Sequence, residues 1–341
     1  MKKKALFFML AAVLLALSAL CGGCGDQPAA DDDTVYLTNV SYDPTRELYE
    51  SYNKLFAAHW QEQTGQTVDI TQSHGGSGAQ ALSVANGLEA DVVTLALEAD
   101  VQSVADAGLI EDGWINEFPL DSSPYTSTIV FIVRAGNPQD IHDWDDIVKP
   151  GVGVITPNPK TSGAARWNFL AAWYYAEQLY GSDEAAVKQF VADLYHNVLV
   201  LDSGARGSTT SFAENKQGDV LLTWENEAFL ILAEYPDEYE IISPSISILC
   251  QPSVAIVDEV VDKNGNREVA TEYLNYLYSD EAQYCIADHY YRPSNQDILA
   301  EYGDVFDLTM NLISIDYFGG WKEAQQKYFT DGAIFDQLYE Q

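Results

Sequence analysis

Residues 67–95 read TVDITQSHGGSGAQALSVANGLEADVVTL. We predict strands at the two ends of this stretch, Thr67–Ile70 and Asp91–Leu95, because both are short apolar runs. Between them a glycine-rich loop, Ser73–Gly78, leads into a predicted helix over Gly78–Gly87. This strand–loop–helix–strand order is typical of a mostly parallel sheet with helices on both faces.

The same alternation of strands and helices continues along the chain. Further strands are predicted at Val35–Val40, Ser127–Val133, Val152–Thr156, Val198–Leu201, Val220–Trp224, Ile241–Ser245 and Ser253–Val257. Further helices are predicted at Thr45–Thr64, Asp100–Ala107, Trp144–Pro150, Ala164–Leu179, Val269–Ala287 and Gly320–Tyr339. A body of roughly 310 residues is larger than one compact core usually holds. We therefore predict two lobes, one formed by residues 35–125 and 248–312, the other by residues 126–247 and 313–341.

Three loops are rich in hydrogen-bond donors and poor in acids. They are Ser73–Gly78, Lys160–Arg166 and Asp202–Thr209, and each follows a predicted strand. In sheets of this kind, ligands bind at the carboxyl ends of strands and at helix N-termini. Small side chains in such loops let several backbone N–H groups point at one anion. Because the loops come from different lobes, the sequence predicts an anion site in a cleft between the lobes.

Acidic residues dominate the composition. The chain has 52 Asp and Glu residues against 17 Lys and Arg, a formal net charge of -35. This charge argues against nucleic acid and anionic lipid as partners. An anion would have to be bound by hydrogen-bond donors of the loops that point at it, rather than by a basic surface. For the same reason, Glu225 and Glu227 must point away from such a site or pair with arginine.

The N-terminus has the pattern of a targeting segment. Three lysines, Lys2–Lys4, precede an apolar run over Ala5–Leu20, which predicts a signal peptide at residues 1–23. Gly23 before Cys24 resembles a bacterial lipobox and predicts lipidation at Cys24, followed by a polar tether over residues 24–34. The alternative is an ordinary cleaved signal with two incidental cysteines. We expect a body in the periplasm or at the outer face of the cell membrane, which it would contact through the lipid anchor only.

Two cysteines remain in the body, Cys250 and Cys285. A disulfide and two buried free thiols both fit an extracytoplasmic protein. Because no group of His and Cys residues has the spacing of metal ligands, we expect neither a metal nor a cofactor.

Seven longer segments are distinctive in composition and order. They are Asn39–Tyr49, Gln72–Gly78, Pro124–Phe131, Ile155–Lys160, Leu201–Ser208, Trp224–Glu227 and Phe318–Trp321. They resemble segments of the sulfate- and thiosulfate-binding proteins that feed ABC importers, and the resemblance covers nearly all of residues 35–340. The resemblance implies the two-lobed α/β periplasmic-binding-protein fold of type II, with a mixed, mainly parallel sheet in each lobe and the ligand between the lobes. It also implies a monomeric receptor, not an enzyme, that delivers its anion to membrane permease subunits.

The resemblance, carried over residue by residue, also implies which groups bind the anion. The backbone N–H donors would be Asp43, Ser77, Gly163, Ala164 and Ala205. The Ser162 hydroxyl and the Trp224 indole N–H would complete the set. Ala164 stands where the family commonly has glycine, a change that is tolerated if its φ is negative. Four residues are expected to support the loops without touching the ligand: Arg46, Arg166, Arg206 and His74.

The chemistry of the donors leaves several functions open. Sulfate is fully ionised at neutral pH and only accepts hydrogen bonds, whereas phosphate keeps a proton that needs an acceptor, for which only Asp43 and Asp202 could serve. Molybdate or a small carboxylate are further possible ligands. An enzyme is the other class: Ser77 lies in a near match to the Gly-x-Ser-x-Gly pattern of hydrolases, with Ala79 in the last place. Of the five histidines, only His74 lies in a candidate loop, and its expected role is to support that loop.

Overall fold

The computed structural model describes residues 34–339, which from Val35 onward form one compact unit. The predicted signal peptide, the lipidation site at Cys24 and the tether up to residue 33 lie outside the described residues. Within the described part, no helix is both long enough and apolar enough to span a bilayer.

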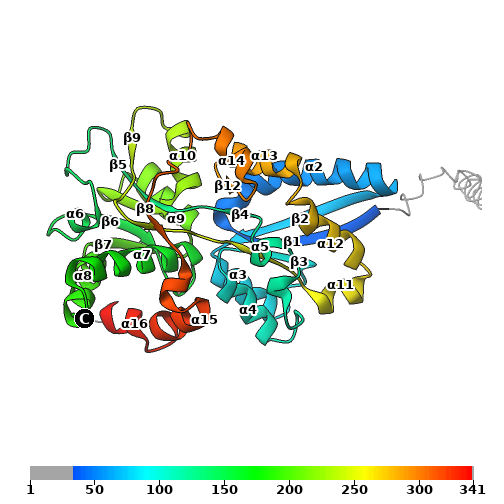
Figure 1. Ribbon diagram of the computed structural model, residues 1–341, viewed down its shortest axis with the longest axis horizontal. Coiled ribbons are helices and arrows are strands. Elements are labelled where there is room, and N and C mark those ends of the chain that lie inside the picture. The colour runs from blue at the N-terminus through cyan, green and yellow to red at the C-terminus, as the bar shows by residue number, and fades with distance from the viewer. Residues whose placement is uncertain (1–33, 340–341) are drawn as a thin grey trace, which may run out of the picture. The chain divides into compact units, whose positions relative to one another are not determined.

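The first sheet has four strands in the order β11-β3-β1-β2, with bounds Ser253–Ile256, Val92–Leu95, Thr34–Tyr42 and Thr67–Gly75. β1 and β3 are parallel, and β11 is antiparallel to β3. Helices cover both faces (Figure 1). Those on or beside this sheet are α2 (Arg46–Thr64), α3 (Ser77–Ala85), α4 (Glu98–Asp106), α11 (Asp258–Asn264), α12 (Arg267–Tyr276) and α13 (Asp280–Asp288).

The second sheet has five strands in the order β7-β6-β8-β5-β9, with bounds Val198–Asp202, Val154–Pro157, Val220–Trp224, Ile129–Arg134 and Tyr239–Ile242. β6 is parallel to both neighbours, as the strand–helix–strand order predicts. β5 is antiparallel to β8 and β9, because it enters from the first sheet through a crossover and not through a helix. The helices around this sheet are α7 (Gly163–Tyr180), α8 (Glu184–His196), α9 (Ala205–Thr209), α10 (Glu225–Glu234) and α16 (Ile334–Tyr339). The two mixed sheets with flanking helices confirm the predicted fold class.

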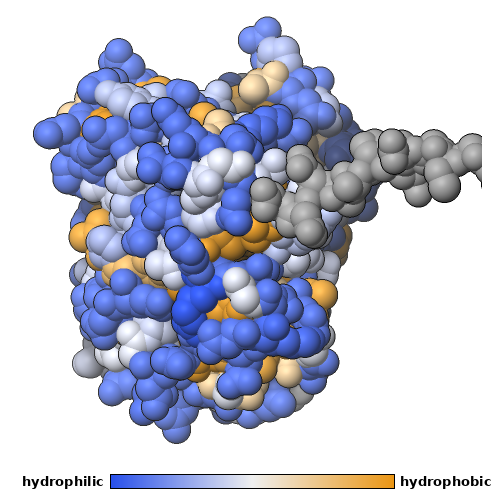
Figure 2. Space-filling view, turned by 90° about the vertical axis from the view of Figure 1, so that its right-hand side faces the viewer, coloured by the Kyte–Doolittle hydropathy of each residue, from blue (hydrophilic) through white to orange (hydrophobic). Residues whose placement is uncertain are grey.

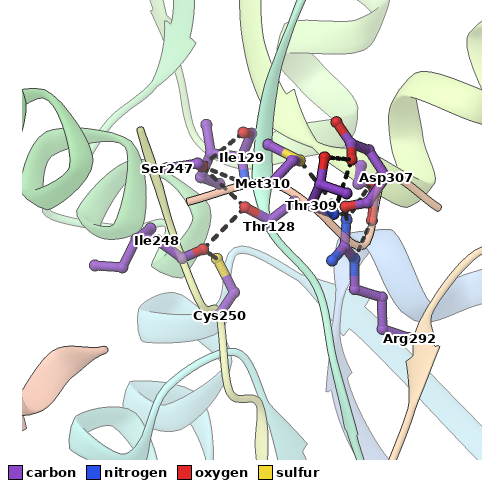
Figure 3. Close-up of polar contacts among 10 residues, drawn as sticks. Thr128, Ile129, Ser247, Ile248, Cys250, Arg292, Asp307, Thr309 and Met310 are labelled. Atoms are coloured by element: carbon purple, nitrogen blue, oxygen red, sulfur yellow. Dashed lines mark hydrogen bonds and ion pairs between the residues drawn. The ribbon is translucent and has the colours of Figure 1, made fainter. Parts of the chain in front are cut away.

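Short strands join the two sheets. β4 (Tyr125–Thr126) leads into β5 and pairs with β12 (Arg292–Pro293), while β10 (Ser247–Ile248) leads back to β11 and pairs with β13 (Leu312–Ile313). Figure 3 shows the centre of these crossovers, where the Thr128 hydroxyl donates to Ser247 Oγ at 2.9 Å. The predicted lobe boundaries fall at these crossovers, and the division into two lobes stays a prediction.

Helix α2 illustrates how the sequence sets local structure. Its buried residues recur every three or four positions: Leu48, Tyr49, Tyr52, Phe56 and Trp60. This spacing forms one apolar stripe that packs on the first sheet. The helix ends at Gly65, whose φ of 78° suits glycine and whose N–H caps the carbonyl of Gln61.

Some sequence predictions of helices were wrong in detail. The predicted helix Val269–Ala287 is two helices, because Ser279 caps a new start at α13. The predicted helix Gly320–Tyr339 is broken into α15 (Trp321–Ala324), a π-helical turn at Gln325–Phe329 and α16. Cys250 and Cys285 are both buried free thiols, so the disulfide alternative is not the arrangement found.

Polar residues cover most of the face shown in Figure 2, which is the right-hand side of Figure 1 and belongs to the first sheet. Apolar groups appear there in small areas between hydrophilic ones. This surface agrees with the acidic composition of the chain.

Candidate functional site

Four helix starts supply the five predicted backbone donors. Asp43 begins the short helix η1 (Asp43–Thr45), Ser77 begins α3, Gly163 and Ala164 begin α7, and Ala205 begins α9. None of these four starts is capped by its N-cap side chain. The N–H groups in the first turn of a helix have no acceptor within the helix. These donors are therefore free for an acceptor outside their helices. Ala164 has a negative φ, so the methyl group it adds is tolerated.

These helix starts line one small pocket. Loops of both sheets contribute to its wall. The lining residues are Tyr42, Asp43, Pro44, Gly75, Gly76, Ser77, Ser162, Gly163, Ala164 and Ala205. Of the predicted ligand residues, all except Trp224 are in this lining.

Two buried side-chain groups at the cavity lack a hydrogen-bond partner among residues 34–339, the Tyr42 hydroxyl and Nε1 of Trp224. Ser162, which lines the cavity, is only 2% exposed. Trp224, at the end of β8, is fully buried, and its Nε1 has no hydrogen-bond partner in the described chain. Its ring centre lies 5.4 Å from that of Tyr42, which lines the cavity. Buried donors are nearly always paired, so two such donors at one cavity indicate a missing acceptor.

The Ser77 hydroxyl, in contrast, is fully engaged. It donates to Asp100 Oδ2 at 2.5 Å and accepts the N–H of Ala96 at 3.0 Å. His74 lies elsewhere, with Nδ1 at 3.3 Å from the carbonyl oxygen of Tyr42. Burial lowers the pKa of His74, which favours the neutral ring. Within the described residues, Ser77 thus lacks the histidine base that a hydrolase needs.

The three arginines differ in position. Arg166 is buried and donates to Asp100 Oδ1 at 2.6 Å and to the carbonyl of Pro159. Arg206 donates to both carboxylate oxygens of Glu47, at 3.0 and 2.9 Å, and to Glu227 at 3.0 Å. Burial opposes the charge of Arg206, but the two glutamates raise its pKa above the ordinary value. Arg46 is exposed and lines a separate surface hollow beside His74.

The acids near the cavity are paired or turned aside. Glu225 accepts two hydrogen bonds from Arg292, and Glu227 accepts from Arg206 and Thr209, which confirms that both acids pair with arginine. Asp202 is not in the lining, and its Oδ1 accepts from Ser211 at 3.1 Å.

The Asp43 carboxylate lies against the backbone of the second sheet's loop. A Cβ placed on Gly204 would clash with Asp43 Oδ2. Burial raises the pKa of Asp43, while Arg46, Arg206 and the Arg206 backbone N–H oppose this shift. The pKa of Asp43 is therefore above its ordinary value, with burial as the main cause.

Close approach of the loops explains two glycines. A Cβ on Gly76 would stand 2.5 Å from the carbonyl oxygen of Ser203 and 2.6 Å from that of Thr161. A Cβ on Gly163 would stand 2.6 Å from the Cβ of Ala96. Only glycine allows the loops of the two sheets to meet around the cavity.

Comparison with known proteins identifies the family. The profile of bacterial extracellular solute-binding proteins matches residues 45–292. The chain belongs to this family. A sulfate-binding protein of Escherichia coli K12 is 58% identical over 306 residues, covering 89% of this chain and 93% of the relative. A thiosulfate-binding protein of Pseudomonas aeruginosa is 44% identical over 336 residues, covering 97% and 98%. The solved sulfate-binding protein SubI of Mycobacterium tuberculosis H37Rv has a TM-score of 0.77 at 29% identity, covering 86% of this chain and 99% of its own.

Sequence reasoning missed several residues that hold this family member's loops in place. They are Glu47, Ala96, Asp100 and Arg292. The presence of Glu225 and Glu227 close to a predicted anion site indicated that each must point away or pair with an arginine. Arg292, however, lies 67 positions from Glu225, and nothing in the sequence joins the two.

Proposed function

We propose that this protein is an extracytoplasmic receptor that captures sulfate or thiosulfate and delivers it to the permease subunits of an ABC importer. The observation that carries the proposal is the set of unpaired donors around one small cavity, including the buried Trp224 Nε1. Relatives that are sulfate- and thiosulfate-binding proteins over nearly their full length support it.

In this proposal the anion is bound by hydrogen bonds without a cation in contact with it. The backbone N–H groups of Asp43, Ser77, Gly163, Ala164 and Ala205 would donate together with Ser162 and Trp224. Helix starts favour negative charge, because their dipoles place a partial positive charge there. A hydrogen bond to a charged partner contributes ~1.5–3 kcal/mol, so several of them offset the loss of hydration. Arg166, Arg206, Arg46 and His74 would stabilise the loops from behind or beside.

The same donors favour a fully ionised oxyanion over phosphate. Phosphate near neutral pH brings an O–H that needs an acceptor. Asp43 is the carboxylate residue in the lining, and its Oδ2 lies against Gly204 of the loop that follows β7. We therefore expect phosphate to bind far more weakly than sulfate.

The protein acts in this proposal as a binding protein and not as an enzyme. Ser77 would contribute only its backbone N–H, because its hydroxyl is held by Asp100 and Ala96. The two predicted lobes would close on the ligand by bending at the crossovers.

Calorimetric titration tests the ligand. Sulfate-depleted protein that begins after Cys24 is titrated with sulfate, thiosulfate, molybdate and phosphate. We expect one sulfur oxyanion per chain, bound at least about a hundred-fold more tightly than phosphate. Absence of binding for both sulfur oxyanions, or a preference for phosphate, would contradict the proposal.

We also propose that Cys24 carries the lipid that holds the receptor at the membrane, as a monomer. The full-length Cys24→Ala variant is then expected in the soluble extracytoplasmic fraction, whereas Cys21→Ala should stay with the membrane. Equal membrane fractionation of both variants would argue against the anchor.

A further inference from the structure

A buried ion pair adjoins the tryptophan of the anion cavity. Arg292, in β12, donates from Nε to Glu225 Oε2 at 2.7 Å and from Nη2 to Glu225 Oε1 at 2.8 Å. The two side chains are only 6% and 5% exposed. A two-point contact of this kind fixes orientation as well as distance. Glu225 is the first residue of α10 and directly follows Trp224.

Arg292 is itself anchored to the crossover region (Figure 3). Its Nη2 also donates to the carbonyl of Asp307 at 3.1 Å and lies 3.7 Å from Met310 Sδ. In the short β12–β4 pairing, Arg292 stands opposite Thr126. The guanidinium is therefore tied to the segment before β13 as well as to Glu225, while the backbone of Arg292 pairs with β4.

The first turn of α10 is held by further contacts. The N–H of Glu225 donates to the carbonyl of Thr128 at 2.9 Å. The Thr128 hydroxyl in turn donates a hydrogen bond to Ser247 Oγ in the neighbouring crossover. Asn226 Nδ2 donates to the carbonyl of Pro44, next to Asp43 in the cavity wall, at 3.0 Å. The helix start that carries Trp224 is thus fixed to the crossovers on one side and to the cavity wall on the other.

We propose that Arg292 is a positioning residue for the anion site. Through Glu225 it fixes the start of α10 and so directs the unpaired indole N–H of Trp224 at the bound anion. Arg292 also neutralises the carboxylate of Glu225, which directly follows Trp224. Without that pairing the carboxylate would repel the anion. Arg292 itself does not line the cavity. The inference rests on the proposed function, because it requires that Trp224 donates to the ligand.

A purely structural ion pair would affect stability and leave the affinity for sulfate unchanged, so the test measures coupling to Trp224. Arg292→Lys keeps the charge but cannot make two parallel contacts. Trp224→Phe keeps an aromatic ring but removes the N–H. We expect sulfate affinity to fall roughly five- to ten-fold in the first variant and roughly ten- to hundred-fold in the second. In the double variant, the loss caused by Arg292→Lys should disappear, to within about two-fold.

The matched control is Arg134→Lys. Arg134 is a partly buried arginine of the second sheet that donates to the carbonyls of Phe212, Gln217 and Gly218, away from the cavity. Its replacement should leave sulfate affinity unchanged even if it lowers thermal stability. Calorimetry gives the affinities, and thermal unfolding shows that each variant is folded.

Each other outcome overturns the inference. An Arg292→Lys variant with wild-type affinity, or losses that simply multiply in the double variant, would show that Arg292 does not act through Trp224. If Arg292→Lys does not fold, Glu225→Asp, which keeps the charge but shortens the side chain that meets Arg292, takes its place in the same cycle, with the same expectation and the same contradicting result. If the wild-type protein does not bind sulfate, the proposed function is overturned as well. If the wild-type protein binds sulfate and only the variants depart from the expectation, the proposed function stands and the role of Arg292 is wrong.

Discussion

The loops of the two sheets contribute unequally to the cavity. Those of the first sheet bring two of the proposed donors, Asp43 and Ser77, while those of the second bring Ser162, Gly163, Ala164, Ala205 and Trp224. The first-sheet side instead brings carboxylates, Asp100 and Glu47, that hold arginines from the second. We infer that the second-sheet loops carry most of the affinity and that the first-sheet loops complete the enclosure. The predictions below test this division of roles.

The largest expected difference is between the two serines. Ser162→Ala removes a hydroxyl from the second-sheet side of the cavity lining, and we expect it to weaken sulfate binding by ~1.5–3 kcal/mol, or roughly ten- to hundred-fold. Ser77→Ala keeps its backbone N–H but leaves the Ala96 N–H without an acceptor. We therefore expect Ser77→Ala to lower the free energy of unfolding by ~1–3 kcal/mol with much less effect on affinity.

Calorimetry and thermal unfolding of the two serine variants check this contrast. Equal losses of affinity in both would show that the roles of the two loops are assigned wrongly. If neither variant loses affinity, the ligand binds elsewhere.

A smaller effect is expected where the first-sheet loop meets the second. Gly76→Ala places a Cβ against two carbonyl oxygens of the second-sheet loops. Overpacking of this kind costs about 1–2 kcal/mol, so sulfate affinity should fall roughly ten-fold as the loops fail to close. The control is Gly303→Ala, because a Cβ there makes only an ordinary contact, 3.5 Å from the carbonyl of Ala300. Unchanged affinity in Gly76→Ala would mean that this contact does not form with the ligand bound.

The smallest expected effect is that of pH on affinity. Sulfate carries no proton between about pH 5 and 8, and the proposed donors do not titrate there. Calorimetry at several pH values should give a nearly constant affinity. A curve that follows a group titrating near pH 6–7 would indicate phosphate-like recognition and contradict the account.

Stability should depend on pH even where affinity does not. Burial lowers the pKa of His74 below its usual 6.5, so the unfolded chain takes up this proton at a higher pH than the folded one does. The contribution of the neutral ring is fully present above about pH 6.5 and is lost as the pH falls from there towards the lowered pKa. Thermal unfolding of wild type and His74→Gln should show this difference below pH 6.5, and parallel curves would contradict it.

Residue pattern alone predicted the alternation of strands and helices, because apolar periodicity determines which face is buried. Helix α2 matches the prediction to within one residue at its start. Helix α10 was not predicted, since its first turn buries Glu225, Asn226 and Glu227, which do not form an apolar stripe.

The donor loops of the site were also visible in the sequence, because glycine, serine and alanine after a strand allow close backbone approach. The resemblance to a known family added Asp43 and Trp224. The partners of the charged residues could not be predicted, because Asp100 and Arg166, or Glu225 and Arg292, are brought together only by the tertiary fold. The position of Arg46 in the sequence led to the expectation that it supports the loops. In the structure Arg46 lies beside the loops and is exposed.

The most direct test of the central claim is the nuclear magnetic resonance spectrum of the ¹⁵N-labelled protein with and without sulfate. New hydrogen bonds to an anion shift amide protons to lower field. The account predicts the largest such shifts for the backbone N–H groups of five residues and for the indole N–H of Trp224. The five residues are Asp43, Ser77, Gly163, Ala164 and Ala205. Large shifts confined to residues outside the cavity, with the Trp224 indole signal unmoved, would contradict the account.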